Sequence, residues 1–224
     1  NFSAAERVFE ILDIDPDIEN LEQSTVMPVI KGNVEFDDVT FSYEDNVPVL
    51  KNVSFKIEAG ESIALVGETG AGKTTIVNLS SRFYDAGQGR ILVDGTDVKG
   101  VTLESLRSQM GIMLQDTFLF SSTIKENIRY GKLDATDEEI IAAAKAVNAH
   151  DFIMALENGY ETEVKERGSR LSVGQRQLIS FARALLADPR ILILDEATSN
   201  IDTQTDKLVQ DGIKALLTNR TSFV

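Results

Sequence analysis

Polar and apolar residues alternate in part along the first third of the chain, as they do in half-buried β-strands. Residues 34–43 and 49–57 are rich in β-branched and aromatic side chains, and the polar residues 44–46 separate them. This pattern predicts two antiparallel strands joined by a turn. A further strand is predicted at residues 90–93, where the dipeptide Asp94-Gly95 then predicts another turn.

Three short runs are almost entirely apolar and predict strands, of which the second and the third in the sequence are expected to be buried. They are Ile63–Val66, Gly111–Leu114 and Ile191–Leu194. The last run is typical of a parallel strand that is covered on both faces of its sheet. Residues 221–224 predict the start of one more strand.

Apolar residues spaced three or four apart predict helices in most of the remaining chain. The predicted helices span about 3–12, 73–79, 103–107, 136–147, 151–156, 172–186 and 205–217. Thr136 and Glu139 form a capping box at the start of one of them, and Asp188-Pro189 ends another. From residue 116 to about residue 177 no convincing strand is found, so this region is predicted to be a mostly helical insertion between two strands.

Composition narrows the class of protein without identifying it. The chain has 224 residues, of which 42% are hydrophobic and 26% charged, which is ordinary for a globular protein. The net charge of −14 disfavours a nucleic-acid partner, because phosphate backbones favour a basic surface. The absence of cysteine excludes a disulfide framework and a thiolate zinc site. The longest apolar runs fall far short of the roughly 20 residues that a membrane-spanning helix needs.

One glycine-rich stretch predicts a phosphate-binding loop. It follows the predicted strand at 63–66 and consists of Gly67, Glu68, Thr69, Gly70, Ala71, Gly72, Lys73, Thr74 and Thr75. Glycines allow the backbone to turn so that its amides face an anion, and the helix that follows adds its N-terminal partial charge. Lys73 is expected to reach the β- and γ-phosphates of a nucleotide, and the Thr74 hydroxyl to bind Mg²⁺.

Two adjacent acids predict the rest of the chemistry. Asp195 and Glu196 directly follow the buried strand at 191–194. Ligands of open α/β sheets bind at the carboxyl ends of the strands, and neighbouring side chains point in different directions. We therefore assign Asp195 to the coordination sphere of Mg²⁺ and Glu196 to the role of general base for an attacking water.

Several ordered motifs, which together cover almost the whole chain, resemble those of the nucleotide-binding domain of exporter-type ATP-binding cassette (ABC) transporters. Gln115 matches the glutamine of the Q-loop, residues 171–175 (Leu-Ser-Val-Gly-Gln) match the family signature, and residues 199–202 match the D-loop. Residues 162–168 resemble the segment that precedes the signature in exporters. Tyr43 and Val49 lie where the family places the groups that flank adenine, although an aromatic residue in a strand is by itself more often a core residue.

The resemblance implies an α/β fold, namely a P-loop NTPase core of RecA-like type with an antiparallel β subdomain and an inserted helical subdomain at about 116–177. Residues 1–24 would form a linker helix and acidic linker that follow a membrane domain, and residues 25–224 would form the ATPase domain, truncated at its C-terminal end. Two such domains, identical or related, would close on two ATP molecules with Mg²⁺. Ser172, Gly174, Gln175 and Asp202 of each would contact the ATP held by the other.

The resemblance also places the protein at the cytoplasmic face of the cell membrane, joined to a transmembrane domain upstream in the same polypeptide. The surface that receives this domain is expected near Gln115 and residues 116–120. Two departures from the family pattern stand out: Val173 replaces the first glycine of the signature, and the chain stops before the family's switch histidine. His150, the only histidine, is expected at a helix junction and not at the site.

Two other functions remain open at this point. One is a soluble ABC-type ATPase that acts as a clamp in DNA repair or translation, against which the acidic balance and the linker helix argue. The other is a fragment that binds ATP but hydrolyses it poorly, because the switch histidine is missing.

Overall fold

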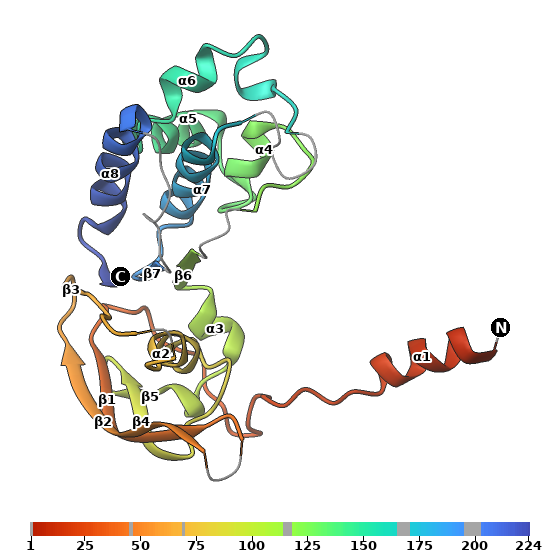
Figure 1. The fold of residues 1–224 in the computed structure, drawn as a ribbon, viewed down its shortest axis with the longest axis vertical. Helices are drawn as coiled ribbons and strands as arrows, with labels where there is room; N and C mark the ends of the chain where they lie inside the picture. The colour runs from red at the N-terminus through yellow and green to blue at the C-terminus, as the bar shows by residue number, and fades with distance from the viewer. Residues whose placement is uncertain (1, 45–46, 69, 114–117, 165–170, 195–202) are drawn as a thin grey trace.

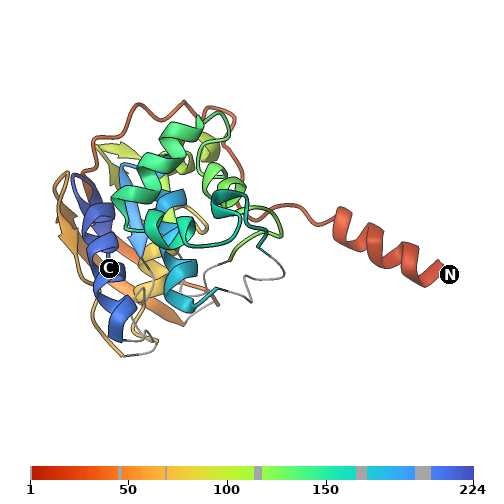
Figure 2. The same ribbon diagram turned by 90° about the horizontal axis from the view of Figure 1, so that it is seen from above.

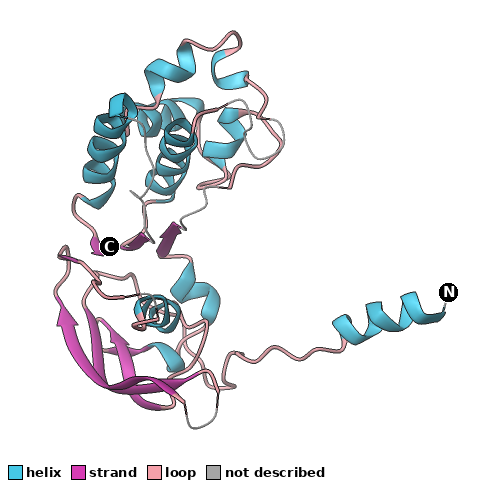
Figure 3. Ribbon diagram, viewed as in Figure 1, coloured by secondary structure: helices cyan, strands magenta, loops and turns pink. Residues whose placement is uncertain are grey.

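The computed structural model describes residues 2–44, 47–68, 70–113, 118–164, 171–194 and 203–224, and it describes only the backbone of residues 2–5, 11 and 203–206. Its strands form two four-stranded sheets. Figure 3 shows the antiparallel sheet in the lower part of the molecule, most of the helices in the upper part, and short parallel strands between them.

The antiparallel sheet contains β1 (Val34–Ser42), β2 (Pro48–Ile57), β4 (Gln88–Val93) and β5 (Thr96–Asp97), in the order β2-β1-β4-β5. The two strands predicted from alternation are therefore present and pair as a hairpin. Val34, Phe36, Val39 and Phe41 of β1 are all buried, so the apolar positions of the pattern face the core.

The parallel sheet contains β3 (Ser62–Ile63), β6 (Met110–Met113), β7 (Ile191–Leu194) and β8 (Thr221–Phe223), in the order β3-β8-β7-β6. The strands predicted from the three apolar runs are present, but of these only β7 is buried at every position. In β6 only Met113 is buried, and β3 is neither buried nor as long as the predicted run at 63–66. Beyond Ile63 this segment keeps one backbone hydrogen bond to the end of β8, from the amide of Leu65 to the carbonyl oxygen of Val224 at 2.7 Å.

The helices of the described residues agree with most of the helical spacing in the sequence. They are α1 (Phe2–Leu12), α2 (Lys73–Ser80), α3 (Leu103–Arg107), α4 (Ile124–Arg129), α5 (Asp137–Ala146), α6 (His150–Met154), α7 (Val173–Ala187) and α8 (Thr203–Leu217), with 3₁₀ turns η1 (Val98–Gly100) and η2 (Gly159–Glu161). The capping box of Thr136 and Glu139 is confirmed. No helix among the described segments is long and apolar enough to cross a membrane.

The helix α4, which has six residues, was not predicted from the sequence. A local signal was nevertheless present. Thr123 precedes Glu126 by three residues, and its side chain accepts a hydrogen bond from the amide of Glu126 as the N-cap of the helix.

Two separate hydrophobic cores meet at β7. Ile191 and Ile193 pack with the antiparallel sheet and α2, whereas Leu192 and Leu194 pack with the core formed by helices α4 to α8. Successive side chains of a strand point to opposite faces, so one four-residue strand contributes to both cores. This explains why the run is apolar at every position, as the sequence analysis expected for a strand covered on both faces.

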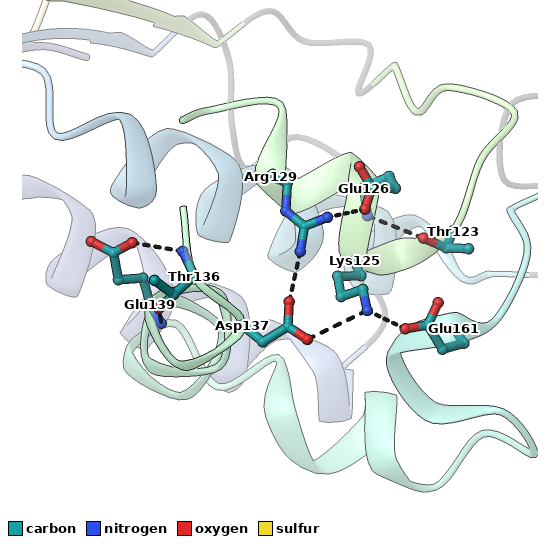
Figure 4. A network of polar contacts seen from close by, with 8 residues as sticks. All are labelled: Thr123, Lys125, Glu126, Arg129, Thr136, Asp137, Glu139 and Glu161. Atoms are coloured by element: carbon teal, nitrogen blue, oxygen red, sulfur yellow. Dashed lines mark hydrogen bonds and ion pairs between the residues drawn. The ribbon is translucent and has the colours of Figure 1, made fainter. Parts of the chain in front are cut away.

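Charged residues at the surface join the short helical elements of the upper part. Lys125 contacts Asp137 and Glu161, and Arg129 contacts Asp137 and Glu126, so that α4, α5 and η2 are connected (Figure 4). Exposed ion pairs of this kind contribute little free energy each. Their role is to orient elements whose packing comes from buried apolar side chains.

Beneath these pairs a buried polar cluster fixes the segment before α4. The carboxamide of Asn127, which is 1% exposed, accepts from the amide of Phe120 and donates to the carbonyl oxygens of Phe120 and Thr123. The guanidinium of Arg183 on α7 donates to the carbonyl oxygens of Asn127 and Phe118, and burial lowers its pKa. Buried polar groups paired in this way hold a loop in one conformation.

The helix α1 stands apart from the rest of the molecule in two perpendicular views (Figures 1 and 2). Residues 13–18 lead from it back to the body, and the large apolar side chains Val8, Phe9 and Leu12 are exposed. The predicted division into a linker at 1–24 and an ATPase domain at 25–224 stays a prediction.

The turn between β4 and β5 connects the antiparallel sheet to the segment that precedes β1. Asp94 and Gly95 both have positive φ, 49° and 78°, as a two-residue hairpin turn requires. Burial raises the pKa of the Asp94 carboxyl, but hydrogen bonds from Lys31, Gly32 and Asn33 outweigh this and hold the pKa below its ordinary value.

Because the pKa of Asp94 is lowered in the folded state, its contribution to stability is complete above the unfolded pKa of about 3.9 and is lost as the pH falls through the folded pKa. We expect Asp94→Asn to lower the melting temperature at pH 7 by roughly 2–4 °C, which corresponds to about 1 kcal/mol in a chain of this size. The difference from the unaltered protein should shrink below pH 4. Calorimetry between pH 3 and 7, with the exposed Asp15→Asn as control, checks this; a difference that grows towards low pH would contradict it.

Candidate functional site

The glycine-rich stretch adopts the strand–loop–helix arrangement that the sequence predicts. The chain leaves β3 after Ile63 and enters α2 at Lys73. Gly70 and Gly72 have φ of 87° and 92°, in the left-handed region that favours glycine. At Gly72 a side chain is also excluded by space, since an added Cβ would lie 2.8 Å from Cδ2 of Leu50.

The first turn of α2 offers backbone amides to a ligand. Gly72 is the N-cap, no side chain caps the helix, and the first bond along it runs from the amide of Ile76 to the carbonyl oxygen of Gly72 at 3.0 Å. The amides of Lys73, Thr74 and Thr75 precede this bond, and helix geometry leaves such amides without an intrahelical acceptor. Together with the helix dipole they form an anion-binding end.

Lys73 folds back over the loop. Its Nζ donates to the carbonyl oxygen of Gly67 at 2.6 Å and to that of Glu68 at 3.0 Å. Both contacts lie at the exposed surface and are of ordinary strength. A phosphate that enters the loop offers the ammonium group a stronger, charge-assisted partner in the same place.

The β1–β2 hairpin brings Tyr43 and Val49 next to the start of α2. The hydroxyl of Tyr43 donates to Oγ1 of Thr75 over 3.2 Å, and Nδ2 of Asn78 donates to Tyr43 Oη over 3.4 Å. Val49 Cγ1 lies 3.6 Å from the position of a Cβ built on Gly72. Residues more than twenty positions apart in the sequence therefore meet at the loop.

The ring of Tyr43 is not a core residue, because it is 47% exposed. It meets the rings of Phe41 and Tyr84 edge-on, with centroids 4.8 Å and 5.0 Å away. Edge-on neighbours and an anchored hydroxyl hold the ring in one orientation beside the loop. The exposure excludes the interpretation of Tyr43 as a core residue, and its place beside adenine stays a prediction.

The signature segment forms a second helix end. Ser172 is the N-cap of α7; its Oγ accepts from the amide of Gln175 at 3.2 Å, and Oε1 of Gln175 accepts from the amide of Ser172 at 3.0 Å. The helix thus begins at Val173, and the side chain of Gln175 belongs to the capping box. α7 packs against α4, α5 and α8, whereas α2 lies with the antiparallel sheet (Figure 1).

The carboxyl ends of the parallel strands share one edge of the sheet. Met113, the last residue of β6, pairs in register with Leu194, the last residue of β7. In the sequence, Gln115 follows β6 by two residues, and Asp195 and Glu196 directly follow β7. Thr69, Gln115, Asp195, Glu196 and Asp202 themselves lie outside the described residues.

The described residues hold one of the predicted metal ligands, Thr74, at the second position of α2. Among these residues no three His, Cys, Asp or Glu side chains gather in a group that could hold a metal ion. A hydroxyl next to a phosphate-binding helix end fits Mg²⁺, which takes oxygen ligands and keeps phosphate oxygens in its sphere. The other predicted ligands, Gln115 and Asp195, lie outside the described residues, so the metal site stays a prediction.

His150 lies away from the loop, at the start of α6, as the sequence predicts. Its Nδ1 is 2.9 Å from the hydroxyl of Tyr160 in η2. Burial raises the pKa of Tyr160 to about 12. The tyrosine therefore stays protonated at neutral pH, and the pair joins two helical elements.

Two arginines at the C-terminal end of α2 were not predicted as functional residues. Arg82 follows the helix and is 1% exposed, and Arg107 binds the carbonyl oxygens of Ser81 and Arg82. Nothing in the local sequence around a single arginine indicates that it holds the end of a helix.

The chain is similar over almost its full length to known proteins. A sequence model of the family described as ABC transporter matches residues 50–199. An ABC transporter ATP-binding protein of Bacillus subtilis, YfiC, is 53% identical over 99% of this chain, and a fatty acid ABC transporter ATP-binding/permease protein of Mycobacterium bovis is 49% identical over 99%. The structure of a bacterial Atm1-family ABC exporter with ATP bound superposes with a TM-score of 0.89 at 40% identity over 99% of the chain.

The chain spans only part of the length of these proteins. It covers 37% of the Bacillus subtilis protein, 35% of the Mycobacterium bovis protein and 39% of the exporter chain of known structure.

The conformation of Gly72 yields a test of the loop. We expect Gly72→Ala to weaken the binding of ATP about tenfold or more, because the left-handed backbone costs an L-residue roughly 1–2 kcal/mol and the new Cβ would also displace Leu50. Isothermal titration of the purified chain with ATP measures the change.

Gly60→Ala serves as the matched control. Gly60 has φ of 84° with nothing within 4 Å of an added Cβ, and it lies in a turn outside the loop. Its variant should lose stability to a similar backbone strain and keep its affinity for ATP. Equal losses of affinity in both variants would show that Gly72 has no special part in binding.

Proposed function

The chain belongs to the ABC transporter family, and from this membership we propose that it is the ATP-binding and ATP-hydrolysing domain of an exporter. The single observation that supports this most directly is the first turn of α2. Amides of an uncapped helix end, the ammonium group of Lys73 and the exposed ring of Tyr43 gather there around one loop. A nucleoside triphosphate offers a phosphate chain and a flat base to these groups.

Binding would proceed from the loop outward. The amides of Lys73, Thr74 and Thr75 would bind phosphate oxygens, and the Lys73 ammonium would leave the carbonyl oxygens of Gly67 and Glu68 for the β- and γ-phosphates. Tyr43 would stack on the adenine, with Val49 at its edge. Stacking on an exposed ring gives affinity without a strict requirement for one base.

Hydrolysis would take place at the carboxyl edge of the parallel sheet. Mg²⁺, when bound, neutralises charge that develops on the phosphate oxygens. Thr74, Gln115 and Asp195 are the groups of this chain that would hold it. Glu196, one position beyond Asp195, would accept a proton from the attacking water as general base.

Two anion-binding helix ends in one chain support a dimer of nucleotide-binding domains. The start of α7 packs with the helical elements and not with α2, so in one chain it is set apart from the loop. In a head-to-tail pair, Ser172 and Gly174 of one domain would contact the ATP of the other. The Ser172 oxygen already accepts from Gln175, but its hydroxyl proton remains available for donation to a phosphate.

Gln175 and Asp202 are proposed at the same interface. Because the Gln175 side chain takes part in the capping box, we expect it to act by holding Ser172 and the amides of α7 in place. Val173, which replaces a glycine of the family pattern, is 47% exposed at the first position of the helix. With valine at this position the helix still begins at Val173 and keeps its capping box, so the amides of its first turn stay at the helix end.

A membrane domain in the same polypeptide is the proposed partner, which would place the domain at the cytoplasmic face of a membrane. The length of the relatives and the word permease in one of their names support this. The surface around Phe118, Phe120 and Tyr130, which are 56%, 38% and 58% exposed, would receive it. Arg183 lies beneath the rings of Phe120 and Tyr130, so this aromatic surface has a rigid base.

We expect Lys73→Ala to weaken ATP binding by at least about tenfold, because hydrogen bonds to charged groups contribute roughly 1.5–3 kcal/mol. Titration with ATP at constant ionic strength measures this. Lys145→Ala, which removes an exposed lysine of α5, is the control for the change in net charge. Unchanged affinity in the Lys73 variant would contradict the assignment of the loop.

We expect Glu196→Gln to lower the rate of phosphate release about 10²–10⁴-fold while ATP binding persists, since the amide cannot accept the proton. The variant should accumulate as an ATP-bound dimer in size-exclusion chromatography with light scattering. The exposed Glu138→Gln of α5 should behave as the unaltered chain. Normal turnover in the Glu196 variant would remove this residue from the role of general base.

ATP binding without phosphate release in the unaltered chain would favour the alternative of a hydrolysis-impaired fragment.

A further inference from the structure

The acidic linker does not run free between α1 and the body. Residues 19–30, here called the strap, lie along η1 and α3. Thr25 forms a parallel bridge with Val101: its amide donates to the carbonyl oxygen of Gly100 at 3.0 Å, and its own carbonyl oxygen accepts from the amide of Thr102 at 2.9 Å. The strap is therefore bound by backbone pairing of the same kind as in a sheet.

Side-chain bonds fix the strap on both sides of this bridge. Oδ1 of Asn20 accepts from the amide of Leu103 at 2.8 Å, at the first position of α3. Oγ of Ser105 accepts from the amide of Met27, and Oε1 of Gln109 accepts from the amide of Ile30, each at 2.8 Å. Because Met27 and Ile30 are also buried, the strap belongs to the packed structure.

One buried cation binds the strap to the end of α2. Arg82 donates through Nη2 to the carbonyl oxygen of Glu19 at 3.1 Å and through Nη1 to that of Val101 at 3.0 Å. Its Nε forms an ion pair with Asp85 at 3.0 Å. The side chain of Arg82 is 1% exposed, so all three acceptors replace water that the guanidinium has lost.

Arg82 is the second residue after α2, and Arg107 of α3 holds the same helix end. Arg107 donates through Nε to the carbonyl oxygen of Ser81 at 3.1 Å and through Nη2 to that of Arg82 at 2.7 Å. Its guanidinium also lies over the ring of Phe83, 4.7 Å from the centroid. The carbonyl oxygens of the two residues that follow α2 thus have a cationic partner, which the helix dipole favours.

The opposite end of this helix is the phosphate loop. α2 has eight residues, so its two ends are about 12 Å apart at 1.5 Å per residue. A short helix moves as a rigid body, and any displacement of Ser81 and Arg82 would displace the amides of Lys73, Thr74 and Thr75. Gly72 leaves little freedom at that end, since it lies against Leu50 and Val49.

We propose that Arg82 is a positioning residue that couples the strap at residues 19–30 to the phosphate loop through α2, so that docking of the strap raises the affinity for ATP. The inference rests on the proposed function, because it assigns a control to the same loop. The contact works in both directions: if the docked strap favours ATP, bound ATP must favour the docked strap by the same factor.

The first experiment removes the acceptor on the strap and leaves Arg82 in place. A chain that lacks residues 1–20 has lost the Glu19 carbonyl oxygen and Asn20, whereas a chain that lacks residues 1–12 has lost only α1. We expect the first truncation to weaken ATP binding about fivefold or more, the lower range of allosteric coupling, and the second to leave it unchanged. Equal affinities of the two truncated chains would overturn the proposal.

The second experiment combines the truncation with Arg82→Lys. Lysine keeps the positive charge near Asp85 but lacks the planar fork that reaches two carbonyl oxygens. Arg82→Lys should weaken ATP binding in the chain with the intact strap and add little in the chain that lacks residues 1–20. If both changes lower the melting temperature but leave the dissociation constant for ATP within twofold, Arg82 is merely structural and the proposal is wrong.

Hydrogen exchange tests whether bound ATP stabilises the docked strap, and it needs no truncated chain. The amides of Thr25, Met27 and Ile30 should exchange more slowly when ATP is bound, and Arg82→Lys should abolish this difference. Exchange rates that do not respond to ATP in the unaltered chain would overturn the coupling.

Lys73→Ala distinguishes failure of the coupling from failure of the proposed ATP site. If it abolishes ATP binding while the strap truncation has no effect, the ATP site is supported and only the coupling is wrong. If the unaltered chain binds no ATP, both fall.

Discussion

The structure depends on the burial of one four-residue strand between two cores. Ile191 and Ile193 enter the core of the antiparallel sheet, and Leu192 and Leu194 enter the core of the helices. A shift of the register by one residue would move each of the four side chains from one core to the other. The strand is thus fixed along its axis, and its carboxyl end, where Asp195 and Glu196 follow in the sequence, is fixed with it.

The proposed site is built on a helix that is held at both ends by residues from elsewhere in the chain. At its start, Gly72 packs against the β1–β2 hairpin, which also supplies Tyr43 and Val49. At its end, Arg82 binds the carbonyl oxygens of Glu19 in the strap and of Val101, and Arg107 binds that of Ser81, the residue after α2. Preorganisation of this kind leaves the amides of the first turn directed at a ligand before it arrives. In the coupling proposed above, the strap would change the affinity of the loop through the same helix.

Elements with a strong local pattern were predicted from the sequence with small errors. The strands at 34–43 and 191–194 and the helices α5 and α7 have a period of 2 or 3.6, or a run of apolar residues, long enough to recognise. The helix α4 was missed although Thr123 and Glu126 form a cap at its start. The strand β3 proved shorter than its apolar run, because only Ser62 and Ile63 pair with β8. Of the site residues, the loop, Tyr43, Val49 and the start of α7 lie where the sequence placed them along the chain, and their roles remain proposals.

The sequence by itself determined the family, the phosphate loop and the order of the motifs, because these are local: glycines, a lysine and a capping serine act through neighbours a few residues away. Only the tertiary structure decided which distant residues meet at the loop. No spacing in the sequence indicates that Tyr43 lies against Thr75, that β7 serves two cores, or that Arg82 binds the carbonyl oxygen of Glu19 more than sixty positions earlier. Such contacts follow from the packing of whole elements, in which a buried charge finds its acceptors among backbone groups that carry no residue-specific signal.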